Sequence, residues 1–384
     1  MTVGAAPPST HARGRFRPTV ATIDLDAVRH NVSLIRPAGA ALMAVVKADG
    51  YGHGASEVAR AALEAGAAWL GVALVEEGIR LRDSGIDAPV LVLAEFPPGS
   101  EADALAAGLT PTVYSPEAIR AIAGARGSAH PIGPVGVHIK VDTGMHRVGA
   151  APGDAAGLVR AAVAAGLSVD GLWTHLAVAD EGGDPYTDRQ LERFRAAAAE
   201  VAADGVRPIL HAANSAALLS RPDAHFDLVR AGIAVYGLSP DPALDSGAAG
   251  LRPAMSWTSR VSFVKRLAGA EALGYGLRYR LDRRANVATV PVGYGDGYAR
   301  ALSGRASVLI RGRRRPVAGT ISMDQLLVDV GDDPVRAGEE VVLLGRQGDE
   351  EITAGELARL AGTIAYEVVC AVGRRVPREY VHVG

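Results

Sequence analysis

Short apolar, β-rich runs alternate with alanine-rich segments across residues 40–240 of the chain. Between these runs, segments such as Ala55–Ala65 and Gln190–Ala203 repeat apolar residues at helical spacing, which is the βα alternation of parallel sheets. Eight βα units in about 200–250 residues predict a (β/α)8 barrel. In chain order, the eight predicted strands are Leu42–Ala48, Trp69–Leu74, Val90–Phe96, Leu109–Tyr114, Val135–Val141, Val169–Leu176, Pro208–Ala212 and Phe226–Ala231.

The pattern changes after about Pro253, where apolar runs are joined by glycine and charged turns. One helix is expected over about Ala354–Ile364, after Thr353 as its N-cap. This pattern predicts a second, mainly β domain over 254–384, after a barrel over 15–253 and a mobile tail over 1–14. Its predicted strands are Val261–Val264, Val287–Val292, Val308–Ile310, Leu326–Val330 and Val341–Leu344.

The bulk composition narrows the classes of ligand and location. The chain has 384 residues, 48% of them hydrophobic, and a formal charge of -2, so no net field favours nucleic acid or an anionic membrane. The single cysteine, Cys370, excludes an internal disulfide and is typical of a reducing compartment. No apolar run reaches the roughly 18 residues needed to span a membrane. A cytoplasmic protein with a small-molecule ligand is therefore expected.

Reactive side chains gather where the predicted barrel strands end, which is the end that carries the chemistry in such barrels. Taken singly, each has an ordinary structural interpretation, such as a solvated lysine, a helix cap or a hydrogen-bonded core histidine. Taken together, they indicate a site for an anion and an amine. The residues are Lys47, Lys140, Asp142, Arg147, His175, Asn214, Ser215, Arg230 and Gly232.

Two of these strand ends fit a phosphate group. Barrels of this kind often bind phosphate in the loops after strands seven and eight, where Asn214-Ser215 and Gly232-Ile233 fall. A phosphate site combined with Lys47 after strand one suggests pyridoxal 5′-phosphate, which carries a phosphate at one end and an aldehyde at the other. Partial burial near arginines is expected to lower the pKa of Lys47 and supply the neutral amine that bonds to an aldehyde.

Several motifs in one order make the chain resemble the alanine racemases, which are pyridoxal-phosphate enzymes built from a barrel and a C-terminal β domain. The match runs from about Val20 to the C-terminus. The motifs are AVVKADGYGHG (Ala44–Gly54), HIKVDTGMHRVG (His138–Gly149), HAANSAA (His211–Ala217), VRAGIAVYG (Val229–Gly237), GYG (Gly274–Gly276), GYGDGYAR (Gly293–Arg300), SMDQ (Ser322–Gln325) and YEVVC (Tyr366–Cys370).

The resemblance implies a role for each matching residue. Lys47 would bind the cofactor covalently and act as one base, and Tyr275 would be the second base, reaching the pocket of the other subunit of a homodimer. Arg230 would lie at the pyridine nitrogen, with His175 between Arg230 and Tyr275. The phosphate would be held by Tyr51, Ser215, Tyr366 and the backbone of Gly232 and Ile233, with Asn214 at the same end of the pocket.

On the substrate side, the resemblance implies that Arg147 contacts the cofactor's phenolic oxygen and the substrate carboxylate. The amide of Met323 and the hydroxyl of Tyr294 would lie near the substrate. Lys140 matches a lysine that is carbamylated in several family members and braces that arginine. Two positions depart from the family pattern: His146 replaces a common glycine, which concerns the loop shape, and Ser322 replaces a cysteine found in some members.

Other functions stay open at this point. A racemase for serine or a broader amino-acid range would use the same bases, a non-catalytic pyridoxal-phosphate carrier would keep the lysine and phosphate loops, and a decarboxylase could share the two-domain plan. No catalytic metal is expected, because His138, His146, His211 and His225 lack zinc-site spacing. The cluster Arg311–Arg315 and the glycines of Gly293–Gly297 are predicted to be turns, not nucleotide or nucleic-acid sites.

Overall fold

The computed structural model describes residues 16–129, 134–181, 184–240 and 250–382, so the predicted tail over 1–14 lies outside the described residues. The chain divides into two compact units. The barrel unit comprises Thr22–Ser256, Thr353–Gly373 and Arg378–Gly384. The β unit comprises Met1–Ala21, Trp257–Ile352 and Arg374–Pro377.

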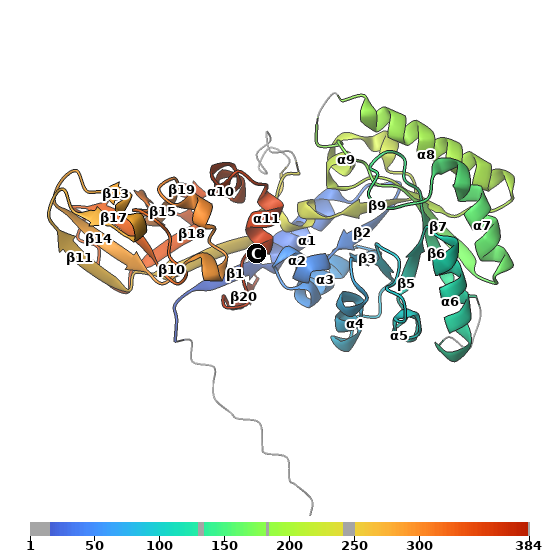
Figure 1. Cartoon of the computed structure of the whole chain (residues 1–384), viewed down its shortest axis with the longest axis horizontal. Coiled ribbons are helices and arrows are strands. Elements are labelled where there is room, and N and C mark those ends of the chain that lie inside the picture. The colour runs from blue at the N-terminus through green and yellow to red at the C-terminus, as the bar shows by residue number, and fades with distance from the viewer. Residues whose placement is uncertain (1–15, 130–133, 182–183, 241–249, 383–384) are drawn as a thin grey trace, which may run out of the picture. The chain divides into compact units, whose positions relative to one another are not determined.

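Eight parallel strands form the centre of the barrel unit, in the order β8-β7-β6-β5-β4-β3-β2-β9. Figure 1 labels most of them. β2 also pairs with β9, and the last gap is bridged where Arg230 N–H donates to the Ala213 carbonyl at 3.0 Å, so the barrel is nearly closed. All eight predicted strands are confirmed, with shorter bounds. These are β2 (Ala41–Val45), β3 (Trp69–Val72), β4 (Val90–Val92), β5 (Thr110–Val113), β6 (Gly136–Lys140), β7 (Ser168–Trp173), β8 (Ile209–His211) and β9 (Leu228–Ala231).

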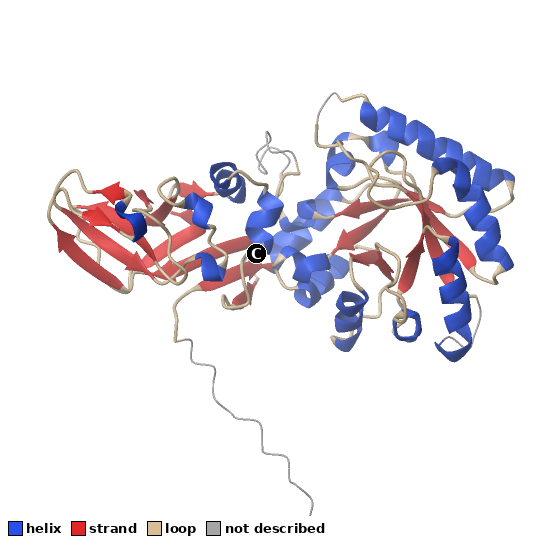
Figure 2. Ribbon diagram, viewed as in Figure 1, coloured by secondary structure: helices blue, strands red, loops and turns tan. Residues whose placement is uncertain are grey.

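Helices surround these strands (Figure 2). Apolar residues from three strands, Met43, Leu91 and Leu228, are fully buried together in the barrel core, which burial of apolar area stabilises. The longer helices are α1 (Leu25–Ile35), α3 (Ala55–Glu64), α4 (Val75–Asp83), α5 (Glu101–Ala106), α6 (Pro116–Ala129), α7 (Ala155–Ala164), α8 (Tyr186–Ala203) and α9 (Ser215–Ser220). Shorter turns are α2 (Lys47–Tyr51), η1 (Pro152–Asp154), η2 (Pro222–Ala224) and η3 (Ile233–Tyr236).

Two late helices cluster with the barrel unit and not with the β unit. The predicted helix after Thr353 is confirmed as α10 (Ala354–Ala361), where Thr353 Oγ1 accepts from Glu356 N–H at 3.0 Å. It ends at Gly362, whose φ of 74° is the left-handed conformation common after helices. α11 (Ala365–Cys370) and β20 (Arg378–Val381) follow. The last part of the chain therefore adds residues to the barrel unit.

The β unit is built from antiparallel ladders and confirms the predicted mainly β architecture. One of its sheets has the order β11-β14-β17. β1 and β10 begin in one unit and end in the other. The strands are β1 (Val20–Asp24), β10 (Met255–Arg260), β11 (Phe263–Leu267), β12 (Ala272–Leu273), β13 (Tyr279–Arg280), β14 (Ala285–Val290), β15 (Ser307–Ile310), β16 (Arg313–Pro316), β17 (Leu326–Gly331), β18 (Glu340–Gln347) and β19 (Glu350–Ile352), with turns η5 (Tyr275–Leu277), η6 (Tyr294–Asp296) and η7 (Arg300–Leu302).

The arginine cluster is only partly the turn that the sequence predicted. Arg311 and Gly312 do turn, with φ of 56° and 65°. The next arginines instead enter β16, which pairs with β15 through Ile310 opposite Arg313. Arg315 also forms an ion pair with Asp333. An arginine run can continue a strand because side chains alternate between its two faces and the charges reach acidic partners or water.

Candidate active site

Lys47 lies two residues past β2, at the start of a turn whose backbone is left-handed. The sequence predicted a strand continuing to the lysine and then a glycine-rich loop, but β2 ends at Val45. The chain then keeps positive φ from Ala48 (52°) to Gly52 (79°). Left-handed backbone costs non-glycine residues about 1–2 kcal/mol each, so this turn must be held by its surroundings.

Glu77 on α4 holds the first part of the turn. Its Oε1 accepts from Ala48 N–H at 2.7 Å, and its Oε2 accepts from Ala73 N–H at 2.8 Å. Asp49 Oδ1 accepts from Ala55 N–H at 3.0 Å, which joins the turn to α3. These carboxylates compensate for the left-handed backbone and fix the start of the Lys47 side chain.

The last part of the turn is covered by the end of the chain. The Gly52 carbonyl accepts from Arg378 Nε at 3.0 Å and from Nη2 at 2.8 Å. A Cβ added at Gly52 would lie 2.4 Å from the Val369 carbonyl oxygen, so α11 packs directly on the turn. Only glycine fits there. This packing brings Tyr366, on α11, to Tyr51, with ring centroids 6.1 Å apart.

Tyr51, Ser215 and Gly232 form a small cradle of hydrogen-bonding groups. Ser215 Oγ accepts from Gly232 N–H at 2.8 Å and from Ala234 N–H at 3.4 Å. A Cβ added at Gly232 would lie 2.7 Å from the Tyr51 hydroxyl, so a larger residue would fill the cradle. Backbone N–H groups at helical turns bind phosphate oxygens, so this donor set fits the phosphate of pyridoxal phosphate.

The other predicted phosphate residues surround this cradle. Ile233 begins η3, and the side chain of Asn214 is used to cap α9, accepting from Ala217 N–H at 3.1 Å. Burial raises the pKa of Tyr366 to about 12 and raises that of Tyr51 further. Both phenols are therefore protonated at neutral pH and can donate hydrogen bonds to an anion.

Five cationic or titratable groups lie at the same end of the barrel, and the positive charges lower the pKa of their titratable neighbours. Burial lowers the pKa of Lys47, and the charge of Arg147 lowers it further. Burial also lowers the pKa of His175 well below its usual value. Nearby positive charges lower it further, in the order Arg230, Arg147, Lys140 and Lys47. His175 is therefore a neutral imidazole, and Lys47 loses its proton more readily than an exposed lysine.

Arg230 is buried and held by several acceptors. Its Nη2 donates to the carbonyls of Thr174 (2.6 Å) and Ala212 (3.0 Å) and lies 3.4 Å from His175 Nδ1. Burial lowers the pKa of Arg230 to about 9, which leaves the guanidinium charged at neutral pH. Its orientation is set by backbone carbonyls just past the ends of β7 and β8, which suits a fixed charge beside an aromatic nitrogen.

Lys140 is almost fully buried at the end of β6. Its Nζ donates to the Val148 carbonyl and lies 5.1 Å from the centre of the Trp173 ring. Burial lowers the pKa of Lys140 to about 8, although the charge of Asp142 acts in the opposite direction. About a tenth of the amine is therefore neutral at pH 7, far more than for an exposed lysine. The ordinary interpretation of a solvated strand lysine is wrong, because this side chain is 2% exposed.

The departure at His146 has a local explanation. His146 takes the left-handed conformation, with φ of 57°, that a glycine would adopt readily. Asp142 Oδ1 accepts from His146 N–H and from Gly144 N–H, both at 3.0 Å. This carboxylate holds the loop that leads to Arg147, so the loop keeps a glycine-like shape without the glycine.

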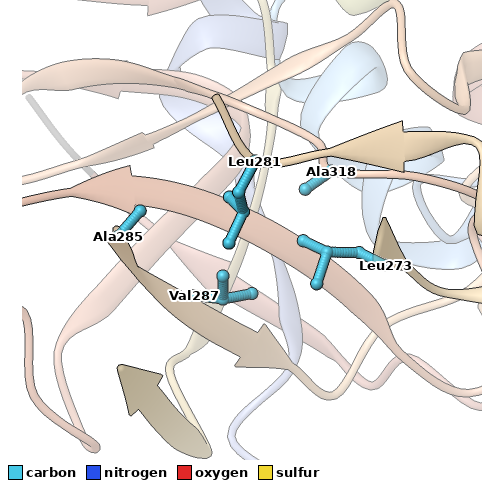
Figure 3. Close-up of a cluster of buried hydrophobic side chains, with 5 residues drawn as sticks. All are labelled: Leu273, Leu281, Ala285, Val287 and Ala318. Carbon is cyan, nitrogen blue, oxygen red and sulfur yellow. The ribbon is translucent and has the colours of Figure 1, made fainter. Parts of the chain in front are cut away.

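The remaining predicted site residues lie in the β unit. Tyr275 is at the tip of the β12–β13 hairpin and is 72% exposed, and its carbonyl accepts from Thr320 Oγ1 at 2.8 Å. An apolar cluster packs the hairpin against β14 (Figure 3). Tyr294 and Met323 are 41% and 52% exposed. The cluster consists of Leu273, Leu281, Ala285, Val287 and Ala318.

Some residues that hold Lys47 and Arg230 in place are not predicted as site residues from the sequence. Besides Glu77, His211 Nδ1 lies 3.0 Å from Arg230 Nη1, and His211 Nε2 lies 3.0 Å from His138 Nδ1. Because arginine only donates, His211 Nδ1 must accept, and its Nε2–H donates to His138. For both histidines, the sequence excludes a zinc site and predicts no other role. One sequence feature could have indicated a site role for His138. It stands two residues before Lys140, which places both side chains on one face of β6.

A lysine of lowered pKa and an anion cradle at one end of a (β/α)8 barrel define the class of barrel enzymes that use pyridoxal phosphate. Two family models match the chain, described as the alanine racemase N-terminal domain over 23–240 and the alanine racemase C-terminal domain over 254–380. The chain belongs to the alanine racemase family, whose members depend on pyridoxal phosphate.

Individual relatives are similar over nearly their whole length. The chain is 54% identical to the alanine racemase of Symbiobacterium thermophilum, over 95% of this chain and 97% of the relative. It is 49% identical to that of Thermobifida fusca, over 94% and 97%. A crystal structure of alanine racemase from Streptomyces lavendulae superposes with a TM-score of 0.91 at 43% identity, over 96% of this chain and 98% of that one.

Two kinds of feature are absent from the described residues. Among them, no group of three or more His, Cys, Asp or Glu side chains is arranged to hold a metal ion. Within the same residues, no helix combines the length and apolar character needed to cross a membrane.

Proposed function

We propose that this chain interconverts L-alanine and D-alanine with pyridoxal phosphate as its cofactor. The observation that carries the proposal is the pairing of Lys47, whose pKa is lowered, with the Tyr51–Ser215–Gly232 cradle in a member of the alanine racemase family. An amine and an anion site in one barrel unit match the two ends of this cofactor. When bound, pyridoxal phosphate acts as an electron sink that acidifies the α-proton of an attached amino acid.

The residues that hold the cofactor come from the barrel unit. Lys47 supplies the covalent attachment, and the cradle donates to the phosphate together with the N–H of Ile233 and the phenol of Tyr366, near Asn214. Arg230 would lie at the ring nitrogen, and its fixed positive charge would not give that nitrogen a full proton. With the cofactor bound, this fixed charge would favour return of the proton over side reactions.

Racemisation requires two proton carriers on opposite faces of the substrate α-carbon, since a single base tends to return the proton to the same side. Lys47 Nζ and the Tyr275 hydroxyl form this pair, each accepting a proton in one direction and returning one in the other. The lowered pKa of Lys47 supports its role as a base near neutral pH. In the proposed dimer, the neutral His175 would relay between Arg230 and the Tyr275 of a second copy and help that phenol ionise.

Arg147 binds the substrate carboxylate, and Lys140 braces it. In this proposal the neutral amine of Lys140 adds to carbon dioxide, forming an N–C bond and releasing one proton, and the resulting carbamate pairs with the Arg147 guanidinium. The pKa of about 8 supports the neutral amine that this step needs. Activity that is indifferent to bicarbonate, together with density for a plain amine, would count against the carbamate.

Tyr275, Tyr294 and Met323 act on a second copy of the chain. Their exposure, from 41% to 72%, leaves them available to a partner, and we propose a homodimer in which each β unit completes the partner's active site. The amide of Met323 and the hydroxyl of Tyr294 then contact the substrate. Localisation in the cytoplasm and supply of D-alanine to peptidoglycan follow as parts of this proposal.

The direct test is incubation of the holoenzyme with L-alanine in deuterated water, following optical rotation and α-proton exchange together. We expect loss of rotation and incorporation of deuterium at similar rates. Exchange without racemisation would contradict the proposal and favour a decarboxylase or related chemistry. Serine and lysine, assayed beside alanine, separate a dedicated alanine enzyme from a broader racemase, since one methyl group in a pocket changes binding by only about 1–3 kcal/mol.

A further inference from the structure

Two aspartates in the motifs of the β unit have no part in the proposed reaction. Asp296 follows Tyr294 in GYGDGYAR, and Asp324 follows Met323 in SMDQ. Asp296 is fully buried, whereas Tyr294 and Met323 are exposed. A buried carboxylate is costly unless it is paired and hydrogen-bonded, so its partners indicate what it does.

Asp296 is paired with two arginines and with its own loop. Its Oδ1 accepts from Arg17 Nη1 at 2.8 Å and lies 3.4 Å from Arg375 Nε. Its Oδ2 accepts from Gly293 N–H at 3.1 Å. The carboxylate therefore closes the short turn that presents Tyr294 and ties that turn to segments far away in the sequence.

The same turn is bonded directly to the segment that carries Met323. Tyr294 N–H donates to the Ser322 carbonyl at 3.1 Å, and Gly295 N–H donates to the Met323 carbonyl at 2.9 Å. A Cβ added at Gly293 would lie 2.2 Å from the Ser322 carbonyl oxygen, so the two backbones are in close contact. Any displacement of one segment is thus transmitted to the other.

Arg375 joins the two segments a second time. Its Nη2 donates to Asp324 Oδ1 at 2.7 Å, while its carbonyl accepts from Arg17 Nη2 at 3.0 Å. The four side chains form one network, Arg17–Asp296–Arg375–Asp324, with Asp296 as its buried member. Bonds between charged partners are stronger than neutral ones and hold a fixed geometry when one partner is buried.

We propose that Asp296 is a positioning residue that sets Tyr294 and Met323, and so the substrate side of the site, through this network. The inference rests on the proposed function, since it takes Tyr294 and Met323 as substrate contacts. It separates two properties of the enzyme. Substrate binding depends on Asp296, whereas cofactor binding does not, because the proposed cofactor residues belong to the barrel unit.

The first test is Asp296→Asn in the holoenzyme. We expect the KM for L-alanine to rise about 10-fold while kcat stays within about 3-fold, because uniform binding is lost and the proton carriers remain. The affinity for pyridoxal phosphate should not change. Asp332→Asn is the matched control, since Asp332 is an exposed carboxylate paired with Arg266 at 2.6 Å, and it should change neither quantity. A lower kcat with an unchanged KM would overturn the proposal.

The second test does not depend on racemisation. Hydrogen exchange of the amides of Tyr294 and Gly295 should be faster in Asp296→Asn than in the wild type, and unchanged in Asp332→Asn. Unchanged exchange in Asp296→Asn would overturn the positioning role even if the wild type racemises alanine. If the wild type does not racemise alanine but exchange still increases, the proposed function fails and the positioning of the two segments stands.

A third variant keeps the test decisive if Asp296→Asn does not fold. Arg17→Gln removes one ion-pair partner and leaves Arg375 beside the carboxylate. Its side chain is 27% exposed, so folding should tolerate the change. We expect the KM for L-alanine to rise, but only about 2–3-fold, and the amide of Tyr294 to exchange faster than in the wild type. No change in either measurement would overturn the proposal.

Discussion

The barrel unit and the β unit present their proposed site residues in opposite ways. In the barrel unit, Lys140, Ser215 and Arg230 are at most 4% exposed, and their partners lie in the same unit. In the β unit, Tyr275 and Met323 are more than half exposed. The barrel tunes its groups by burial, which shifts their pKa values, whereas the β unit fixes backbone positions and leaves its side chains available. Cofactor capture and the second proton transfer should therefore be separable by mutation.

The largest expected effect comes from removing the amine of the barrel unit. Lys47→Ala should abolish covalent retention of pyridoxal phosphate after borohydride reduction and lower racemisation by at least about 10³-fold, since a nucleophile and a base are lost together. Lys265→Ala, which removes an exposed lysine on β11, is the control and should retain both. Retention of the cofactor on another lysine with full activity would contradict the assignment of Lys47.

A side chain that fills the cradle should weaken cofactor binding and leave the β unit unchanged. In Gly232→Ala, the new Cβ would lie 2.7 Å from the Tyr51 hydroxyl, and the affinity for pyridoxal phosphate should fall about 10–100-fold, since overpacking costs about 1–3 kcal/mol. Gly124→Ala, on α6 with nothing within 4 Å of the added Cβ, should leave that affinity unchanged. Equal affinities in a cofactor titration would show that the cradle does not hold the phosphate.

A third expected effect concerns the pH dependence of stability. Because burial lowers the pKa of Lys140 from 10.5 to about 8, the unfolded state binds more protons between these values, and stability rises with pH across this window. Relative to Lys140→Met, the wild type should gain at most about 3 kcal/mol from pH 7 to pH 10.5 in bicarbonate-free buffer, measured by denaturant unfolding. A stability difference between the wild type and Lys140→Met that stays constant over this pH range would indicate that no buried amine titrates there.

Much of the fold follows from local pattern. Apolar runs bounded by helical segments predicted all eight barrel strands, and Thr353 predicted the start of α10. The short strands β12, β13 and β16 were not predicted, because two to four residues carry too little periodicity and depend on a paired strand. The place of α10 and α11 in the barrel unit also depends on contacts far apart in the sequence, such as Val369 with Gly52.

The candidate site was predictable in residue type but not in conformation. Strand ends predicted where Lys47, His175 and Arg230 lie, but the left-handed turn after Lys47 depends on Glu77, 29 positions from Ala48. The burial of Lys140 was likewise hidden, since a lysine at a strand end usually reaches water. The β-unit residues were found through family motifs alone, because an exposed tyrosine in Gly-Tyr-Gly has an ordinary interpretation as a turn residue.

The comparison between the units rests on one claim, that the barrel unit and the β unit each supply one proton carrier. Tyr275→Phe tests it most directly, with α-proton exchange in deuterated water measured separately from L-alanine and from D-alanine. We predict that racemisation falls about 10²–10⁴-fold, that exchange is lost for one enantiomer and kept for the other through Lys47, and that pyridoxal phosphate stays bound. Exchange of both enantiomers at the wild-type rate, with racemisation intact, would contradict the account.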